Sequence, residues 1–229
     1  MRKVFWDNPY QQKLTTHVSS VEGNQALFDE TIAFSFAGGQ ESDRAFINDM
    51  PILDSKRIDD LIFYTLPEGH GLSRGMAIVM TIDWPRRYRL MRLHFAAELI
   101  LELVTQMVNW EKVGAHIGEG KARIDFKSEA NANTLFESLL PAFNKIIDGN
   151  HTIEKGYLDT ETQRRFWKID GFAQVPCGGT HVRSTGEVGR ILLKRDHPGK
   201  GIERIEIRLV DPSALEPGEP NYEPRPERA

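Results

Sequence analysis

The stretch from Asp83 to the residues before Gly114 most constrains the fold, because mainly apolar residues recur in it at helical spacing. Asp83 is a suitable N-cap, and Pro85 is tolerated in a first helical turn. The positions that define one helix face are Leu90, Leu93, His94, Ala97, Leu101, Val104 and Val108. We therefore predict one long helix with a single apolar face over this stretch.

The residues before this helix favour strands. Three segments, "LTTHVSSVEG", "QALFDETIAFSF" and "GMAIVMTID", mix β-branched and aromatic residues with turn signals such as Glu22-Gly23-Asn24. We predict a small β-barrel or sandwich here. The segment "FAGGQESD", residues 36–43, is predicted to be a glycine-containing loop inside it.

The residues after the helix carry both strand and helix patterns. We predict strands at "GKARIDFK", "HTIEKGYLD", "EVGRILLKRD" and "IERIEIRLV", and a short helix or turn at "TETQRRFWKI". Ser128 is a suitable N-cap for a second helix, "EANANTLFESLLPAFNKII", with Pro141 as a kink or break inside it. No glycine-rich nucleotide loop opens a helix, so a two-layer α+β domain is favoured over a doubly wound sheet.

These patterns predict an α+β chain in three parts. Residues 1–83 form a β-rich, barrel-like N-terminal domain, and residues 84–210 form a two-layer α+β domain. Residues 211–229 are rich in proline and glutamate and cannot form a core of their own.

The composition is that of a soluble globular protein, with 229 residues, formal net charge -4, 40% hydrophobic and 27% charged residues. One cysteine excludes an internal disulfide framework and is compatible with a reducing cytoplasm. The N-terminus has no secretory apolar region, and Glu98 and Glu102 interrupt the most apolar run. We therefore expect a cytoplasmic protein that does not bind membranes. The mild acidity opposes non-specific nucleic-acid binding over the whole surface but allows a local basic patch.

Four side chains of metal-ligand type stand in two short motifs. His94 and Glu98 are four residues apart on the predicted helix, so they lie on one face, one turn apart. Cys177 and His181 are four residues apart in "PCGGTHV". Two imidazoles, one thiolate and one carboxylate are suitable ligands for tetrahedral zinc.

The same residues also fit a purely structural interpretation. A histidine on an apolar helix face is often a core residue, and a single buried cysteine is usually inert. Glu98 sits at the edge of the apolar stripe, where an ionised carboxylate is costly unless it is paired or bound to a metal. Arg92 and Arg123 are candidate partners, and exposure to solvent beside Glu102 is the remaining alternative.

Taken together, the motifs resemble the editing domain shared by alanyl- and threonyl-tRNA synthetases and the free-standing AlaX-type proteins. "DWPRRYRLMRLHFAAELI" followed by "CGGTHV" is similar to the family's helix motif, usually written HTAxHLL, and to its later CGGTH. Gly38, Gly39 and Gln40 match the family's GGQ loop, and "IGEGKARIDF" resembles the strand after its helix. The resemblance covers nearly the whole chain in the same order, and the length is similar to that of the medium-length AlaX class.

The resemblance implies a trans-editing hydrolase. Its substrate would be mischarged alanine-type tRNA carrying serine or glycine, and its reaction metal-assisted ester hydrolysis with one zinc ion. A pocket built for alanine cannot reject glycine or serine strongly enough by size alone, so a second hydrolytic sieve is needed.

Carried over residue by residue, the family's metal-ligand positions fall on His94, Cys177 and His181. Glu98 stands where the family has its second helix histidine, and Phe95 stands where it has a threonine. Glu98 is then either a fourth zinc ligand or a general base beside a three-ligand zinc. We expect His94 and Glu98 to take part in catalysis as well as in metal binding.

Other residues are expected to contact the substrate. Gly39 and Gln40 of the loop, Thr180 and Arg92 are predicted to bind its aminoacyl end. The tRNA backbone would be held by basic side chains. The candidates are two clusters, one of Arg86, Arg87 and Arg89 beside Arg92, and one of Arg164, Arg165 and Lys168. A solvated face with arginines lying along it is the alternative for either cluster.

The departures at Phe95 and Glu98 keep two other functions open. One is a degenerate paralogue that binds tRNA or protein without hydrolysis. The other is a metal-dependent hydrolase that acts on another small ester or amide. Deacylation assays on charged tRNA and on small esters separate these functions.

Overall fold

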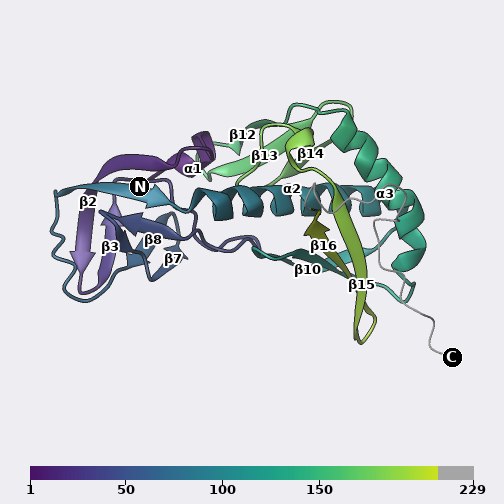
Figure 1. The fold of residues 1–229 in the computed structure, drawn as a ribbon, viewed down its shortest axis with the longest axis horizontal. Helices are drawn as coiled ribbons and strands as arrows, with labels where there is room; N and C mark the ends of the chain where they lie inside the picture. Colours follow the sequence, from purple (N-terminus) through teal and green to yellow (C-terminus); the bar gives the residue numbers. More distant parts are fainter. Residues whose placement is uncertain (211–229) are drawn as a thin grey trace. The chain divides into compact units, whose positions relative to one another are not determined.

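The computed structural model describes residues 1–210 and confirms the α+β class (Figure 1). The chain forms two compact units, Met1–Leu90 and a second unit that begins at Met91. Their boundary lies inside the long helix α2 (Trp84–Met107), whereas the sequence led us to place it before that helix. The tail predicted over residues 211–229 lies outside the described residues.

The first unit is built mainly from strands. Its elements are the short helix α1 (Val4–Asp7) and the strands β1 (Arg2–Lys3), β2 (Lys13–Glu22), β3 (Gln25–Phe28), β4 (Glu30–Thr31), β5 (Ala45–Ile47), β6 (Met50–Pro51), β7 (Asp54–Ile58), β8 (Leu61–Thr65) and β9 (Ala77–Ile82). Seven strands form one antiparallel sheet in the order β6-β5-β9-β2-β3-β8-β7, and β1 pairs in parallel with β4. Within residues 1–90 this sheet keeps β6 and β7 as edge strands, so its hydrogen-bonded ladder is open.

Alternating burial along these strands explains why they pair. Strands β3, β8 and β9 each bury every second residue, which places Phe28, Ile62 and Met80 in the core of this unit. The three predicted strand segments therefore contain real strands. The predicted loop at residues 36–43 contains a tight turn in which Ala37 pairs with Gln40.

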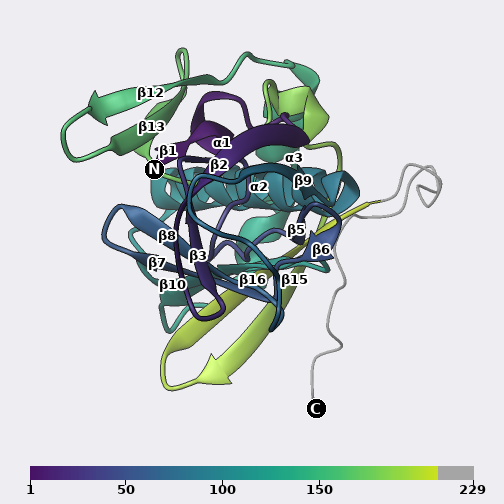
Figure 2. The ribbon, with the colours of Figure 1, turned by 90° about the vertical axis from the view of Figure 1, so that its left-hand side faces the viewer.

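The second unit contains the rest of α2 and two sheets. Its other elements are α3 (Asn133–Asp148), the 3-10 helix η1 (Thr185–Glu187) and the strands β10 (Glu111–Ile117), β11 (Ala122–Lys127), β12 (Glu154–Asp159), β13 (Arg164–Ile169), β14 (Ala173–Pro176), β15 (Ile191–Gly199) and β16 (Ile202–Leu209). The sheets are antiparallel, in the orders β10-β11-β16-β15 and β12-β13-β14. Figures 1 and 2 both show α2 between the two sheets, so there are three layers where we predicted two.

The middle of helix α2, residues 93–100, is buried on nearly every side in the second unit. Seven of the eight residues from Leu93 to Ile100 are buried, and only Glu98 is half-buried. The single apolar face predicted from the sequence is therefore wrong, because a helix enclosed by two sheets needs apolar residues on every side. Among the described residues, no helix has both the length and the apolar character needed to cross a membrane.

Two other local predictions differ from the structure. Residues 164–169, predicted within a short helix or turn, form β13, whose residues alternate between exposed or half-buried and buried positions. Helix α3 begins at Asn133 with Ala132 at its N-cap, so the prediction of Ser128 as the N-cap is wrong. The Ser128 hydroxyl instead accepts the backbone N–H of Ala130 in a turn ahead of the helix. Pro141 lies inside α3, which continues to Asp148.

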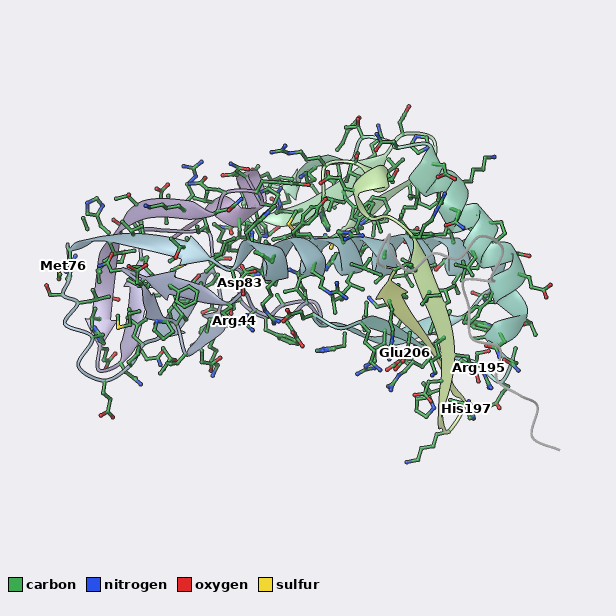
Figure 3. All side chains as sticks on the ribbon, in the orientation of Figure 1. Arg44, Met76, Asp83, Arg195, His197 and Glu206 are labelled. Carbon is green, nitrogen blue, oxygen red and sulfur yellow. The ribbon has the colours of Figure 1, made fainter. Side chains whose placement is uncertain are left out.

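The hairpin of β15 and β16 carries a buried polar network. Glu203 is 1% exposed and accepts two hydrogen bonds from Arg195, at 2.6 Å each. His197 Nδ1 lies 2.7 Å from the same carboxylate, and the backbone N–H of Ala132 donates to it over 3.0 Å. Figure 3 shows Arg195 and His197 on this hairpin. The network ties the hairpin to the start of α3.

Candidate metal centre

Two segments far apart in the sequence supply the candidate ligands. His94 and Glu98 stand one turn apart on α2. Cys177 follows the last residue of β14, and His181 lies between that strand and η1. The structure brings these segments together, as the sequence motifs predicted.

The two imidazoles converge on one sulfur atom. His94 Nε2 lies 3.2 Å and His181 Nε2 lies 3.3 Å from Cys177 Sγ, and the three ligand atoms are all within 4.8 Å of one another. Ligand atoms around a tetrahedral zinc ion are about 3.3–3.6 Å apart, given zinc bond lengths of about 2.0–2.3 Å. The spacing and the chemistry of His94, Cys177 and His181 therefore fit a zinc ion.

Glu98 borders this cluster and is fixed by an indole. Its Oε1 lies 3.5 Å from His94 Nε2 and 3.7 Å from Cys177 Sγ. The indole N–H of Trp167, on β13, donates to Oε2 over 2.8 Å. Trp167 thus occupies one carboxylate oxygen and leaves the other directed at the ligands. Sequence reasoning missed this partner, because the segment that contains it was not read as a strand.

A proton on one imidazole is favoured by the charges of the cluster. Burial lowers the pKa of His94, but Cys177 and Glu98 outweigh it and raise that pKa to about 10. Burial raises the pKa of Glu98, but hydrogen bonds from His94 and Trp167 bring it to about 2. Burial and the charge on His94 lower the pKa of His181. An imidazolium beside the Glu98 carboxylate is thus favoured, and a metal ion that binds His94 through Nε2 would displace its proton.

The imidazoles are packed by aromatic rings as well as by the cysteine. The ring centroids of His94 and His181 are 5.1 Å apart, and Phe95 lies edge-to-face against both His181 and Trp167. Within residues 1–210, Nδ1 of His94 has no hydrogen-bond partner. The usual acceptor for the second nitrogen of a metal-binding histidine is thus missing, and ring packing orients His94 instead.

Backbone contacts hold the segment that carries Cys177 and His181. The backbone N–H of Cys177 donates to the Arg165 oxygen over 2.9 Å, and that of Ile153 donates to the Arg183 oxygen over 2.9 Å. A capping box between Ser184 and Glu187 then starts η1. These contacts fix the cluster's loop to β13 and to the segment before β12.

The predicted substrate contacts lie in different parts of the chain. Gly39 and Gln40 belong to the tight turn of the first unit, where Gly39 has a φ of 87° and Gln40 is buried. Thr180 is buried next to His181. Arg92 donates two hydrogen bonds, of 3.0 and 2.9 Å, to the Val188 oxygen and so joins α2 to the residue after η1. The substrate-binding roles of all four stay predictions.

The arginines at the start of α2 do not form one solvated cluster. Arg87 is fully buried, and its guanidinium binds the Asp43 carboxylate and the backbone oxygens of Pro9 and Ile32. This burial leaves no surface for a phosphate, so the predicted tRNA contact is wrong at Arg87. Arg86 pairs with Glu41 over 2.7 Å, and Arg89 is exposed.

Strand alternation divides the second basic cluster. On β13, Arg165 and Trp167 are buried on the face that contacts α2, whereas Arg164, Phe166 and Lys168 lie on the other face. Lys168 Nζ lies 3.4 Å from Asp170 and 3.8 Å from Glu154. The sequence presented these residues as one patch, but the strand places them on opposite sides.

Comparisons with known proteins agree on one family. A sequence profile of the Threonyl and Alanyl tRNA synthetase second additional domain matches residues 165–206, which include Cys177 and His181. The chain is 32% identical to the alanyl-tRNA editing protein AlaX-M of Pyrococcus horikoshii, over 91% of this chain and 97% of that protein. It is 28% identical to AlaX-M of Methanosarcina mazei, over 83% of this chain and 88% of that protein. It also matches the alanine–tRNA ligase of Methanococcus aeolicus at 26% identity, over 89% of this chain but only 25% of the ligase.

Proposed function

This chain belongs to the AlaX-M family of alanyl-tRNA editing proteins, and from that premise we propose that it hydrolyses the ester of mischarged alanine-type tRNA. The proposed substrates are seryl- and glycyl-tRNA, which an alanine pocket cannot reject by size alone. A cytoplasmic location and tRNA as the partner are part of the proposal. The observation that carries it is the convergence of His94 and His181 on the Cys177 sulfur within a chain of this family.

We propose that His94, Cys177 and His181 hold one zinc ion through Nε2, Sγ and Nε2. When bound, zinc acts as a Lewis acid and lowers the pKa of a coordinated water toward neutrality. Three protein ligands leave a coordination position for water or substrate, which is the arrangement of catalytic rather than structural zinc sites.

Glu98 is the proposed proton acceptor for the attacking water. Its Oε1 faces the ligand cluster from 3.5 and 3.7 Å, while Trp167 holds Oε2. A carboxylate fixed in this way is oriented toward the cluster and ionised before the reaction, so it is able to accept a proton. Because the same distances suit a fourth ligand, this second role for Glu98 is the alternative, and substitution separates the two roles.

The burial of the cluster limits the approach of water. His94 and His181 are each 3% exposed, and Phe95 packs on His181 from the helix side. Phe95 occupies the position of the family's threonine, so an apolar ring replaces a hydroxyl near the ligands. We propose that this ring sets the polarity of the aminoacyl site.

The test is deacylation of seryl-, glycyl- and alanyl-tRNA of the alanine type by the purified protein, with zinc content measured on the same samples. We expect loss of the seryl or glycyl ester and retention of the alanyl ester. His181→Ala and Cys177→Ser should lose both zinc and activity. His17→Ala, at an exposed histidine of β2, is the matched control and should keep both.

Two results would contradict this proposal and favour another function. A zinc-loaded protein that binds tRNA without deacylating it would be a binding module. A protein that hydrolyses small amino acid esters but spares every charged tRNA would be a redirected hydrolase.

A further inference from the structure

The three candidate ligands differ in how far they are exposed to solvent. His94 and His181 are each 3% exposed. Cys177 is half-buried, and its two chain neighbours, Pro176 and Gly178, are exposed. Cys177 is thus the most exposed of the three ligands, and the chain on either side of it borders the approach from solvent to the cluster.

Neither backbone shape nor packing explains why residue 178 is a glycine. The φ of Gly178 lies outside the left-handed region, so its backbone conformation is open to any side chain. Apart from its chain neighbours, no heavy atom in residues 1–210 lies within 4 Å of the position that a β-carbon would take there. By contrast, a β-carbon at Gly156 would lie 2.8 Å from the Phe166 ring, and Gly171 has a φ of 70°. Those two glycines have structural reasons that Gly178 lacks.

The loop that carries Gly178 is held by the backbone contacts on both sides of it. The N–H of Cys177 donates to the Arg165 oxygen over 2.9 Å, and the N–H of Ile153 donates to the Arg183 oxygen over the same distance. These contacts keep the space beside Gly178 in place. A glycine without a conformational or packing reason, next to a candidate ligand, fits a position where a bound molecule comes close to the backbone.

The chemistry of the proposed reaction identifies the part of the substrate that comes closest. The ester carbonyl must reach the ligand cluster, where both imidazoles are buried, so the small aminoacyl group is the part that enters. The next atoms outward along a charged tRNA are those of the terminal ribose, which carries the ester oxygen. The ribose therefore belongs at the exposed edge of the cluster, beside Gly178. A side chain at residue 178 would occupy the same volume.

We propose that the space beside Gly178 receives the terminal ribose of charged tRNA, and that the absence of a side chain at this position admits the ribose to the cluster. This inference rests on the proposed function for the identity of its ligand. Gly178 takes no part in the chemical step. It determines whether the ester of a nucleoside can reach the cluster, whereas a small ester without a ribose does not need this space.

The kinetic test replaces Gly178 with alanine and with valine. Because the backbone conformation and the open space permit both, zinc content should match the wild type and the urea unfolding midpoint should not fall. We expect kcat/KM for seryl-tRNA to fall by about 10- to 100-fold in Gly178→Val and by less in Gly178→Ala, because the cost grows with the volume inserted into an occupied space. Hydrolysis of serine methyl ester, which has no ribose, should proceed in Gly178→Ala as in the wild type.

Gly120→Val is the matched control for this test. Gly120 is exposed in the turn between β10 and β11, its φ is outside the left-handed region, and its β-carbon would also meet no atom within 4 Å. It should leave kcat/KM and zinc content unchanged. An unchanged kcat/KM in Gly178→Val, a loss of zinc from that variant, or an equal loss on the methyl ester in Gly178→Ala would overturn the proposal.

A chemical probe separates this proposal from the proposed function. The chain has one cysteine, so the labelling rate of Cys177 in the zinc-free, full-length protein reports on the approach to the cluster. We expect the bulky fluorescein maleimide to label Gly178→Val several-fold more slowly than the wild type or Gly120→Val. The small reagent iodoacetamide should react with all three proteins at similar rates. Such selective slowing in a protein that deacylates no tRNA would remove the editing function and support Gly178 as the residue that controls access. Equal maleimide rates in a protein with deacylase activity would overturn the role of Gly178 alone.

Discussion

The indole N–H of Trp167 donates to Oε2 of Glu98 over 2.8 Å, and the other carboxylate oxygen faces His94 and Cys177. Trp167 comes from β13 and Glu98 from α2, so the contact joins a sheet to the central helix. Trp167 is fully buried and lies edge-to-face against Phe95, which fixes the indole. Orientation of Glu98 therefore depends on Trp167, which is not one of the candidate ligands.

Trp167→Phe should lower kcat about tenfold and leave zinc affinity within a factor of two or three. The phenyl ring keeps most of the packing, but Glu98 loses its single indole donor and with it the defined direction of Oε1. Steady-state deacylation of seryl-tRNA and zinc competition with a chelator measure the two quantities. Trp110→Phe removes an indole that packs on Phe126 and is the matched control. Equal losses of kcat in both variants would mean that packing alone is responsible.

Replacement of Glu98 distinguishes its two possible roles. If Glu98 is the proton acceptor, Glu98→Gln should lower kcat by about 10²–10⁴-fold while zinc content stays stoichiometric. If it is a fourth ligand, zinc affinity should fall with activity. Glu98→His restores the family's residue, and we expect it to bind zinc more tightly than Glu98→Gln. Chelator competition and single-turnover deacylation on the same preparations provide both readouts.

The candidate ligand residues could be predicted from the sequence because they lie in two short motifs. An i, i+4 pair on a helix places His94 and Glu98 on one face whatever surrounds the helix, and "CGGTH" resembles a known family. What surrounds them could not be predicted. The burial of residues 93–100 depends on two sheets whose strands are distant in sequence, so the sequence predicts a single apolar face where the middle of α2 is buried on nearly every side.

The wrong prediction of a helix or turn at residues 164–169, which form β13, had the largest consequence for the candidate site. Its residues alternate, which places Arg165 and Trp167 toward the cluster and Arg164 and Lys168 away from it. An alternation of exposed and buried residues over only six positions is a weak sequence signal for a strand. Two adjacent arginines followed by two aromatic residues are equally compatible with the surface of a helix. The identification of Trp167 as the partner of Glu98 depends on that alternation.

Glu203→Gln should destabilise the second unit in a pH-dependent way. Burial raises the pKa of Glu203, but Arg195, the Ala132 N–H and His197 together hold it below its ordinary value of 4.5. The carboxylate's contribution is therefore complete above about pH 4.5 and is lost as pH falls through the lower native value. We expect a loss of about 1–3 kcal/mol at pH 7 that shrinks below pH 4.5, measured by urea unfolding. A loss independent of pH would indicate a packing defect instead of a lost charge interaction.

Arg87→Met should destabilise the first unit by about 3–5 kcal/mol, because it leaves the Asp43 carboxylate buried without its cation. Both side chains are 0% exposed, and the Pro9 and Ile32 oxygens lose their donors as well. Urea unfolding followed by circular dichroism measures the change. Arg89→Met, two residues along on the exposed surface, should shift stability by less than about 0.5 kcal/mol. If the two variants were equally stable, Arg87 would not be the structural residue that its contacts indicate. A phosphate-contacting role would instead show as weaker tRNA binding by a fully stable Arg87 variant.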